Sequence, residues 1–176
     1  MKIRFCVGTV MILLFISGCS GPTEKEHLNI MVFSDLPFSY NERIENYFEN
    51  VNNDEGISME VQMFLPSPEK LTVEMVAGEG DIYLVEKSLF PIIFDPVILH
   101  PLDSIVAVVE EENQHIGKNE HTGEEHVYAM TVDSDTSFFQ YLEMDESGSY
   151  VAVMIKERPF YSYGFSVLEA MIDGES

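Results

Sequence analysis

Short apolar runs alternate along the chain with stretches in which apolar residues recur at helical spacing. Residues 28–33 (LNIMVF) are largely apolar and lead into turn-forming residues, which predicts a buried strand. In residues 44–51 the apolar positions fall at i, i+3, i+4 and i+7, the spacing of an amphipathic helix, and Ser39 with Glu42 would form its capping box. Residues 57–63 alternate between apolar and polar and predict a second strand.

The next helix has signals at both ends. Ser67 suits the N-cap, Pro68 suits the first helical position, and Gly78 ends a helix whose apolar face includes Val76. Residues 81–85 (DIYLV) predict a third strand. Strands that alternate with helices favour βαβ units, so we expect a single three-layer α/β domain with a mainly parallel sheet.

The second half of the chain is less regular. A helix is expected over residues 103–112, with Asp103 as its cap. Residues 113–126 are polar and acidic and contain three histidines, which indicates an exposed loop. Residues 127–132 and 150–155 predict two more strands, and a last amphipathic helix begins near Tyr161.

The N-terminus has the pattern of an exported protein. Lys2 and Arg4 precede an uncharged apolar run over residues 5–16. That run is too short to span a bilayer as a helix, which needs roughly 20 apolar residues. A basic start, a short apolar segment and small residues after it predict a signal peptide over residues 1–18.

The end of that signal has a more specific form. Ile16, Ser17, Gly18 and Cys19 resemble the lipobox of bacterial lipoproteins. The resemblance implies cleavage before Cys19, which then carries an S-diacylglycerol group and an N-acyl chain such as palmitate. Two or more chains anchor a protein stably to the membrane. Residues 19–27 would form the lipidated N-terminus and tether, and residues 28–176 the domain; the alternative is an ordinary secretory signal with a chance cysteine.

Composition narrows the function further. The chain has 31 acidic and 9 basic residues and a net charge of −22, which repels nucleic acid phosphates. Nucleic acid is therefore not an expected partner. The only other cysteine, Cys6, lies in the signal peptide, so no cysteine remains for a disulfide, a thiol nucleophile or a thiolate metal site.

Residues 71–86 (LTVEMVAGEGDIYLVE) are similar to a stretch common in the sugar-type extracellular solute-binding proteins of bacterial ABC transporters. Residues 95–103 and 150–172 add looser likenesses to the same family. The matching pattern, a helix end followed by an aspartate that starts a buried strand, consists of Ala77, Gly78, Asp81, Ile82, Leu84 and Val85.

This resemblance implies one lobe of a type II periplasmic-binding fold. The family has two lobes and at least twice this length, with the ligand between the lobes, whereas this chain has room for one. Small lipoproteins of bacilli associated with the use of rhamnogalacturonan and pectin are of this kind. The implied role is accessory to carbohydrate binding or uptake on the outer face of a Gram-positive cell membrane. An oligosaccharide would be the ligand, and an ABC transporter or cell-surface protein the partner.

Candidate ligand-binding residues follow the first and third strands, because open α/β sheets bind ligands beyond the carboxyl ends of their strands. They are Ser34, Asp35, Phe38 and Tyr40 after the first strand and Glu86 after the third. Carboxylates accept hydrogen bonds from sugar hydroxyls, and aromatic faces pack on sugar rings. The alternative is that Ser34 and Asp35 belong to a structural turn and that Phe38 is a core residue.

Other chemistry finds little support in the sequence. The histidines at 115, 121 and 126 match no short metal motif, so neither a metal nor a cofactor is expected. There is no Gly-x-Ser-x-Gly elbow and no phosphate-binding glycine loop, so an enzyme is not expected. An interaction or scaffold lipoprotein without a small-molecule ligand is the alternative function.

Overall fold

The structure, a computed structural model, describes residues 27–51, 57–105, 109–143 and 149–173. The predicted signal peptide, Cys19 and the tether up to residue 26 lie outside the described residues. Among those described, no helix has the length and apolar character needed to cross a membrane. The elements are β1 (His27–Phe33), η1 (Phe38–Tyr40), α2 (Asn41–Val51), β2 (Ser58–Phe64), α3 (Pro68–Ala77), β3 (Ile82–Glu86), η2 (Lys87–Leu89), α4 (Phe90–Ile93), η4 (Glu111–Asn113), β4 (Gln114–Lys118), β5 (Glu125–Val132), α5 (Ser137–Leu142), β6 (Tyr150–Met154) and α6 (Tyr161–Ile172).

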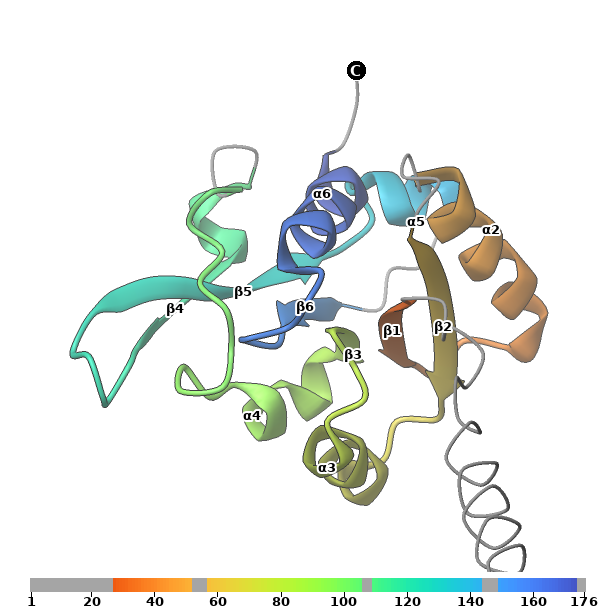
Figure 1. Ribbon diagram of the computed structural model, residues 1–176. Helices are drawn as coiled ribbons and strands as arrows, with labels where there is room; N and C mark the ends of the chain where they lie inside the picture. Colours follow the sequence, from red (N-terminus) through yellow and green to blue (C-terminus); the bar gives the residue numbers. More distant parts are fainter. Residues whose placement is uncertain (1–26, 52–56, 106–108, 144–148, 174–176) are drawn as a thin grey trace, which may run out of the picture.

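The strands form one sheet in the order β2-β1-β3-β6-β5-β4. β1 pairs in parallel with β2 and with β3, and the other pairs are antiparallel. Helices α2, α5 and α6 cover one face and α3 and α4 cover the other (Figure 1). The three-layer α/β prediction is confirmed. The sheet itself is mixed where the sequence predicts a mainly parallel one, because three of its five strand pairs, those that involve β6, β5 and β4, are antiparallel.

The core lies on both faces of the sheet. In β1, Leu28, Ile30 and Val32 pack toward α2, α5 and α6, whereas Met31 and Phe33 pack toward α3 and α4. A strand buried on both faces reads as a continuous apolar run, because both sets of alternating side chains face a hydrophobic layer. This burial explains the run at residues 28–33.

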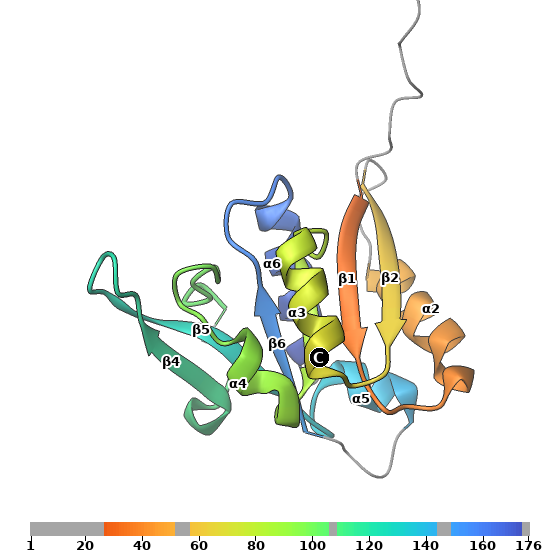
Figure 2. The ribbon, with the colours of Figure 1, turned by 90° about the horizontal axis from the view of Figure 1, so that it is seen from below.

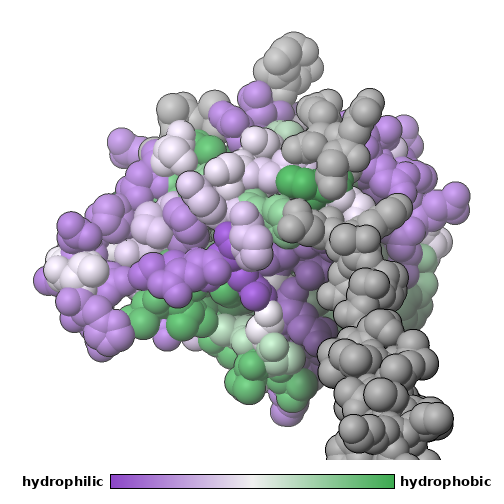
Figure 3. All heavy atoms as spheres, in the orientation of Figure 1, coloured by the Kyte–Doolittle hydropathy of each residue, from purple (hydrophilic) through white to green (hydrophobic). Residues whose placement is uncertain are grey.

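Helix α3 begins and ends where the sequence predicts. The Ser67 hydroxyl accepts a hydrogen bond from the Lys70 N–H at 3.2 Å, and Gly78 ends the helix with φ +70°. The predicted apolar face is wrong in one respect, since Val76 is 82% exposed and Glu74 is buried instead. Glu74 is tolerated there because it forms an ion pair with Lys70. Figure 3 shows the resulting apolar surface on the α3 and α4 side of the molecule.

The second half contains two corrections. Residues 114–118 of the predicted exposed loop form β4, which pairs with β5 in an antiparallel hairpin. The helix expected over residues 103–112 is absent from its described part, where residues 103–105 form a turn and η4 begins at Glu111. The reason lies in Asp103, whose carboxylate accepts from the N–H of Val127 at 3.4 Å and contacts the His126 ring at 2.9 Å. Asp103 therefore fixes the chain to β5 instead of capping a helix.

The start of α2 also differs from the prediction. Ser39 lies inside η1, the short helical turn that leads directly into α2. It is therefore not at the N-cap that the predicted capping box with Glu42 requires.

Candidate functional site

The carboxyl ends of β1 and β3 meet at the point where the strand order reverses. After β1 the chain passes through α2, on one face of the sheet, to β2, which lies on one side of β1. It then passes through α3, on the other face of the sheet, to β3, which lies on the other side of β1. Open α/β sheets place their ligand crevice at such a switch point. Phe33 lies opposite Val85 in the register, so the residues that follow each strand are neighbours.

The structure brings together three of the five residues that the sequence singled out. The Asp35 N–H donates to Glu86 Oε1 at 2.8 Å, and the buried Ser34 hydroxyl lies 2.7 Å from the Tyr150 hydroxyl. Ser34 Oγ also accepts from the Leu36 N–H at 3.0 Å. Tyr150 was missed because it begins β6, a strand whose position between β3 and β5 no local signal reveals.

Burial shapes the electrostatics of this cluster. It raises the pKa of the Glu86 carboxyl, and the nearby Asp35 carboxylate adds to that rise, while the hydrogen bond from the Asp35 N–H opposes it. Burial likewise raises the pKa of the Tyr150 hydroxyl, and its hydrogen bond to Ser34 opposes the rise. The cluster is thus a packed polar junction in which the exposed side chain of Asp35 remains open to solvent.

The two aromatic candidates lie in η1, just beyond this junction. Phe38 is 69% exposed, so it is not the core residue of the alternative interpretation. Tyr40 is half-buried and packs against the core beneath α2. Phe38 therefore presents an aromatic face to solvent next to the switch point, whereas Tyr40 offers less of its ring.

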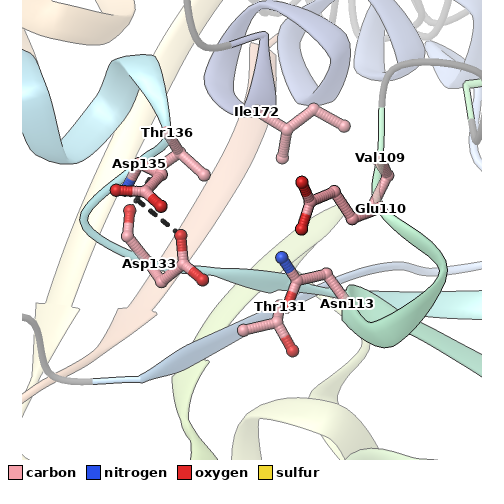
Figure 4. A pocket seen from close by; sticks show the side chains of 8 residues that line it. All are labelled: Val109, Glu110, Asn113, Thr131, Asp133, Asp135, Thr136 and Ile172. Atoms are coloured by element: carbon pink, nitrogen blue, oxygen red, sulfur yellow. Dashed lines mark hydrogen bonds between the residues drawn. The ribbon is translucent and has the colours of Figure 1, made fainter.

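A pocket of about 210 Å³ opens at the same edge of the sheet (Figure 4). The register places it there, because Val132 at the end of β5 lies opposite Tyr150, which in turn lies opposite Glu86. The pocket is lined by Val109, Glu110, Asn113, Thr131, Asp133, Asp135, Thr136 and Ile172.

A tight turn between β5 and α5 positions the acidic side of this pocket. The Asp133 carboxylate accepts from the Asp135 N–H at 3.2 Å, and the Asp133 carbonyl accepts from the Thr136 hydroxyl at 2.6 Å. Glu110 and Asn113 face this turn across the pocket from either end of η4 (Figure 4). The lining combines carboxylate, amide and hydroxyl groups and has no basic residue, which suits ligands rich in hydroxyl groups.

Two of the three histidines of the predicted loop, His115 and His126, take structural positions, whereas His121 is exposed. His115 lies on β4, where its ring contacts Phe90 and its Nε2 lies 3.0 Å from the Thr131 hydroxyl. Burial lowers the pKa of the His115 imidazole, as does the positive charge of Lys87. His126 contacts Asp103. In the part of the chain that the structure describes, no three histidine, cysteine or acidic side chains form a group suited to a metal ion.

Asp81, the aspartate of the solute-binding-protein pattern, lies at the opposite edge of the sheet. It is 5% exposed and accepts from the Asn29 N–H at 2.8 Å, and its other oxygen lies 3.2 Å from Arg158 Nε. Arg158 also donates to the carbonyl of Gly80 at 2.8 Å. Burial raises the pKa of the Asp81 carboxyl despite the opposing effects of Asn29 and Arg158. Asp81 thus ties β1 and β3 to the segment after β6.

Comparisons with known proteins give one relative and one structural neighbour of interest. No family model matches the chain. A Bacillus subtilis (strain 168) protein named "Putative lipoprotein YteS" is 28% identical over 132 residues, which cover 75% of this chain and 73% of the relative. The N-glycan transport solute-binding protein NgtS of Streptococcus pneumoniae, solved in complex with Man5GlcNAc, is 16% identical with a TM-score of 0.39. That match covers 64% of this chain but only 27% of NgtS, so the chain spans about a quarter of that protein's length.

Proposed function

We propose that this protein is a lipid-anchored lipoprotein on the outer face of the cell membrane that assists carbohydrate binding or uptake and has no catalytic activity. The sequence Ile16 to Cys19 has the form of a lipobox, and the Bacillus subtilis relative is named a lipoprotein. Changing Cys19 to Ala should prevent lipidation and processing, so the precursor should accumulate. Membrane retention of a correctly processed Cys19→Ala protein would contradict the anchor.

The observation that carries the carbohydrate part is the chemistry of the carboxyl edge of the sheet. Exposed Asp35 and Phe38 lie at the switch point, and the neighbouring pocket adds Glu110, Asn113 and Asp133. Planar carboxylate and amide groups can each contact two sugar hydroxyls, and an exposed ring can pack on the apolar face of a sugar. Well-formed ligand pockets bury most of their ligand, whereas this edge of the sheet would leave a sugar partly exposed. An accessory role in carbohydrate binding or uptake is consistent with such a partly open site.

The orientation of the chain supports the same proposal. β1 starts at His27 at the amino edge of the sheet and ends at Phe33 beside the candidate residues. Cys19 precedes His27 by eight residues, which extend over at most about 28 Å. An anchor at Cys19 would therefore keep the amino edge within about 28 Å of the bilayer and leave the carboxyl edge free to face away from it.

An interaction lipoprotein without a small-molecule ligand is the second candidate, and one observation favours it. Both oxygens of Glu86 have partners, the Asp35 N–H at 2.8 Å and the Ser88 hydroxyl at 3.4 Å. The Ser34 hydroxyl is engaged by Tyr150 and Leu36. The junction between β1 and β3 is thus closed by its own hydrogen bonds.

Calorimetry of residues 20–176 with a panel of neutral plant-wall oligosaccharides would separate the two functions. A ligand at 100 times its Kd stabilises the folded state by about 2.7 kcal/mol. The shift should shrink in Asp35→Asn or Glu110→Gln but persist in Glu120→Gln, a control in the turn between β4 and β5 at the opposite edge. A shift equal in all three variants would place the ligand elsewhere, and no shift with any sugar would favour the interaction lipoprotein.

A further inference from the structure

Among the described residues, strand β2 forms one border of the sheet and lacks most of the features that usually protect an exposed edge. In natural proteins, edge strands are commonly protected from pairing with other chains by proline, by charged side chains such as lysine, by bulges or by short length. The other border has such features, since β4 carries Lys118 and a register shift between His115 and Ile116. β2 spans seven residues, SMEVQMF, without proline or lysine, and pairs with β1 along its whole length (Figure 2).

The hydrogen bonds to β1 determine which groups of β2 point outward. The Phe64 carbonyl accepts from the Ser34 N–H at 3.0 Å, so Phe64 directs its backbone groups toward β1. Backbone groups of successive strand residues point to opposite sides, so those of Met59, Val61 and Met63 point to the free side. Among the described residues, these three have no partner on that side.

The side chains of the same three residues form an apolar stripe beside the free edge. Met59, Val61 and Met63 are only partly buried where they pack on the core beneath α2. A strand added to this edge would place alternate side chains next to them and bury them further. Such a strand would need apolar residues at every second position.

Acidic residues border this edge. Glu45 and Glu49 on α2 line a hollow of about 230 Å³ with Met59 and Val61, and Glu60 is the one charged residue of β2. With a net charge of −22, two copies of the chain repel each other, and pairing of two β2 edges would bring the same carboxylates together. The same charges attract a cationic partner.

We propose that the free edge of β2 binds an extended segment of a cationic partner protein as a seventh strand of the sheet. The segment alternates apolar residues, which lie beside Met59, Val61 and Met63, with lysine or arginine residues, one of which pairs with Glu60. Its backbone satisfies the three outward N–H and C=O groups, as in other strand-addition complexes. The proposal does not depend on a carbohydrate ligand.

Amide hydrogen exchange of the full chain in a zwitterionic detergent tests the proposal. The probe is a capped heptapeptide of alternating valine and lysine, and the controls carry glutamate for lysine or N-methyl groups on alternate amides. The probe should protect the amides of Met59, Val61 and Met63 and leave those of Glu60 and Gln62, which already face β1, unchanged. Neither control peptide should do so.

Two substitutions in the protein test where the peptide binds. Val61→Pro removes an outward N–H without touching the ladder to β1, and it should weaken binding by about tenfold or more, because at least one paired set of hydrogen bonds is lost. Glu60→Lys should weaken binding of the lysine peptide by several-fold at low salt, because Glu60 lies on the face that the peptide's lysines would occupy, whereas the same charge change in Glu120→Lys, far from the edge, should have a smaller effect. If Val61→Pro fails to fold, the pair of charge variants still decides.

Three results would overturn the proposal. The first is the absence of protection with the lysine peptide. The second is equal protection of all β2 amides, or equal weakening of binding by Glu60→Lys and Glu120→Lys. Either outcome would indicate diffuse charge attraction. The third is protection of Met59, Val61 and Met63 that rises with protein concentration in the absence of peptide, which would make a second copy of the chain the occupant.

Discussion

Replacement of Gly80 by alanine should destabilise the fold more than replacement of Gly78, although the two glycines are separated by one residue. A methyl group on Gly80 would lie 2.5 Å from Tyr83 Cζ and 2.7 Å from Met31 Cγ. Both of those side chains are fully buried, with 0% exposure. A methyl group on Gly78 would meet nothing within 4 Å, but Gly78 has φ +70°.

The magnitudes follow from the two kinds of strain. At Gly80 the Tyr83 ring or the Met31 side chain must move by about 1 Å inside a packed core, and overpacking of this kind costs about 1–3 kcal/mol. At Gly78 alanine must adopt a left-handed conformation, which costs about 1–2 kcal/mol and is offset in part by the lower entropy of the unfolded chain. We therefore expect Gly80→Ala to lower the free energy of unfolding by about 2–3 kcal/mol and Gly78→Ala by about 1 kcal/mol.

Urea denaturation measures this difference directly. The chain has no tryptophan, so helix content followed by circular dichroism is a suitable signal. In a Tyr83→Leu background the Gly80→Ala penalty should shrink, because the contact with the ring is gone and only the contact with Met31 Cγ remains. Equal midpoints for the two glycine variants, or an unchanged penalty in the Tyr83→Leu background, would refute the steric argument.

Three further changes test other parts of the structure. Ser67→Ala removes the acceptor for the Lys70 N–H and should lower the free energy of unfolding by about 1 kcal/mol; an unchanged urea midpoint would contradict the capping role. Tyr150→Phe removes the partner of the buried Ser34 hydroxyl and should cost about 1 kcal/mol by the same assay, whereas a gain would show that the hydroxyl pair is unfavourable. Burial raises the pKa of Tyr83 from 10.0 to about 12, so the folded state keeps a proton that the unfolded chain releases. Stability should therefore fall by about 2 kcal/mol as the pH rises from 10 to 12, and in Tyr83→Phe the decline should be shallower; identical pH profiles would show that Tyr83 does not cause it.

Elements whose signals are local could be predicted from the sequence. α3 was predictable because Ser67, Pro68 and Gly78 act within one turn of each helix end. β1 was predictable because a strand buried on both faces needs apolar residues throughout. β4 was not predictable, since QHIGK is short and polar and becomes a strand only through pairing with β5. The exposure of Val76 was missed for a related reason, because pairing of Lys70 with Glu74 lets a carboxylate occupy the buried face.

The candidate site also has residues that could be predicted from the sequence and residues that could not. Ser34, Asp35 and Glu86 could be placed at one edge because the βαβ order alone makes the carboxyl ends of β1 and β3 neighbours. The pocket near Asp133 could not be predicted, because the direction in which β5 runs within the sheet depends on its pairing with β6, which follows β5 in the chain. The signal that could have located it is the turn sequence Asp133 to Thr136, which directly follows an apolar strand.

The central position of β6 has a consequence for the order in which the sheet can assemble. β6 is the last strand in the sequence, yet it lies between β3 and β5 and joins the parallel half of the sheet to the antiparallel half. Its partner β3 ends at Glu86, and β6 begins only at Tyr150. Contacts between distant segments form slowly, because the loop between them must first close. The parallel and antiparallel halves of the sheet therefore remain unjoined until β6, near the end of the chain, pairs with both β3 and β5.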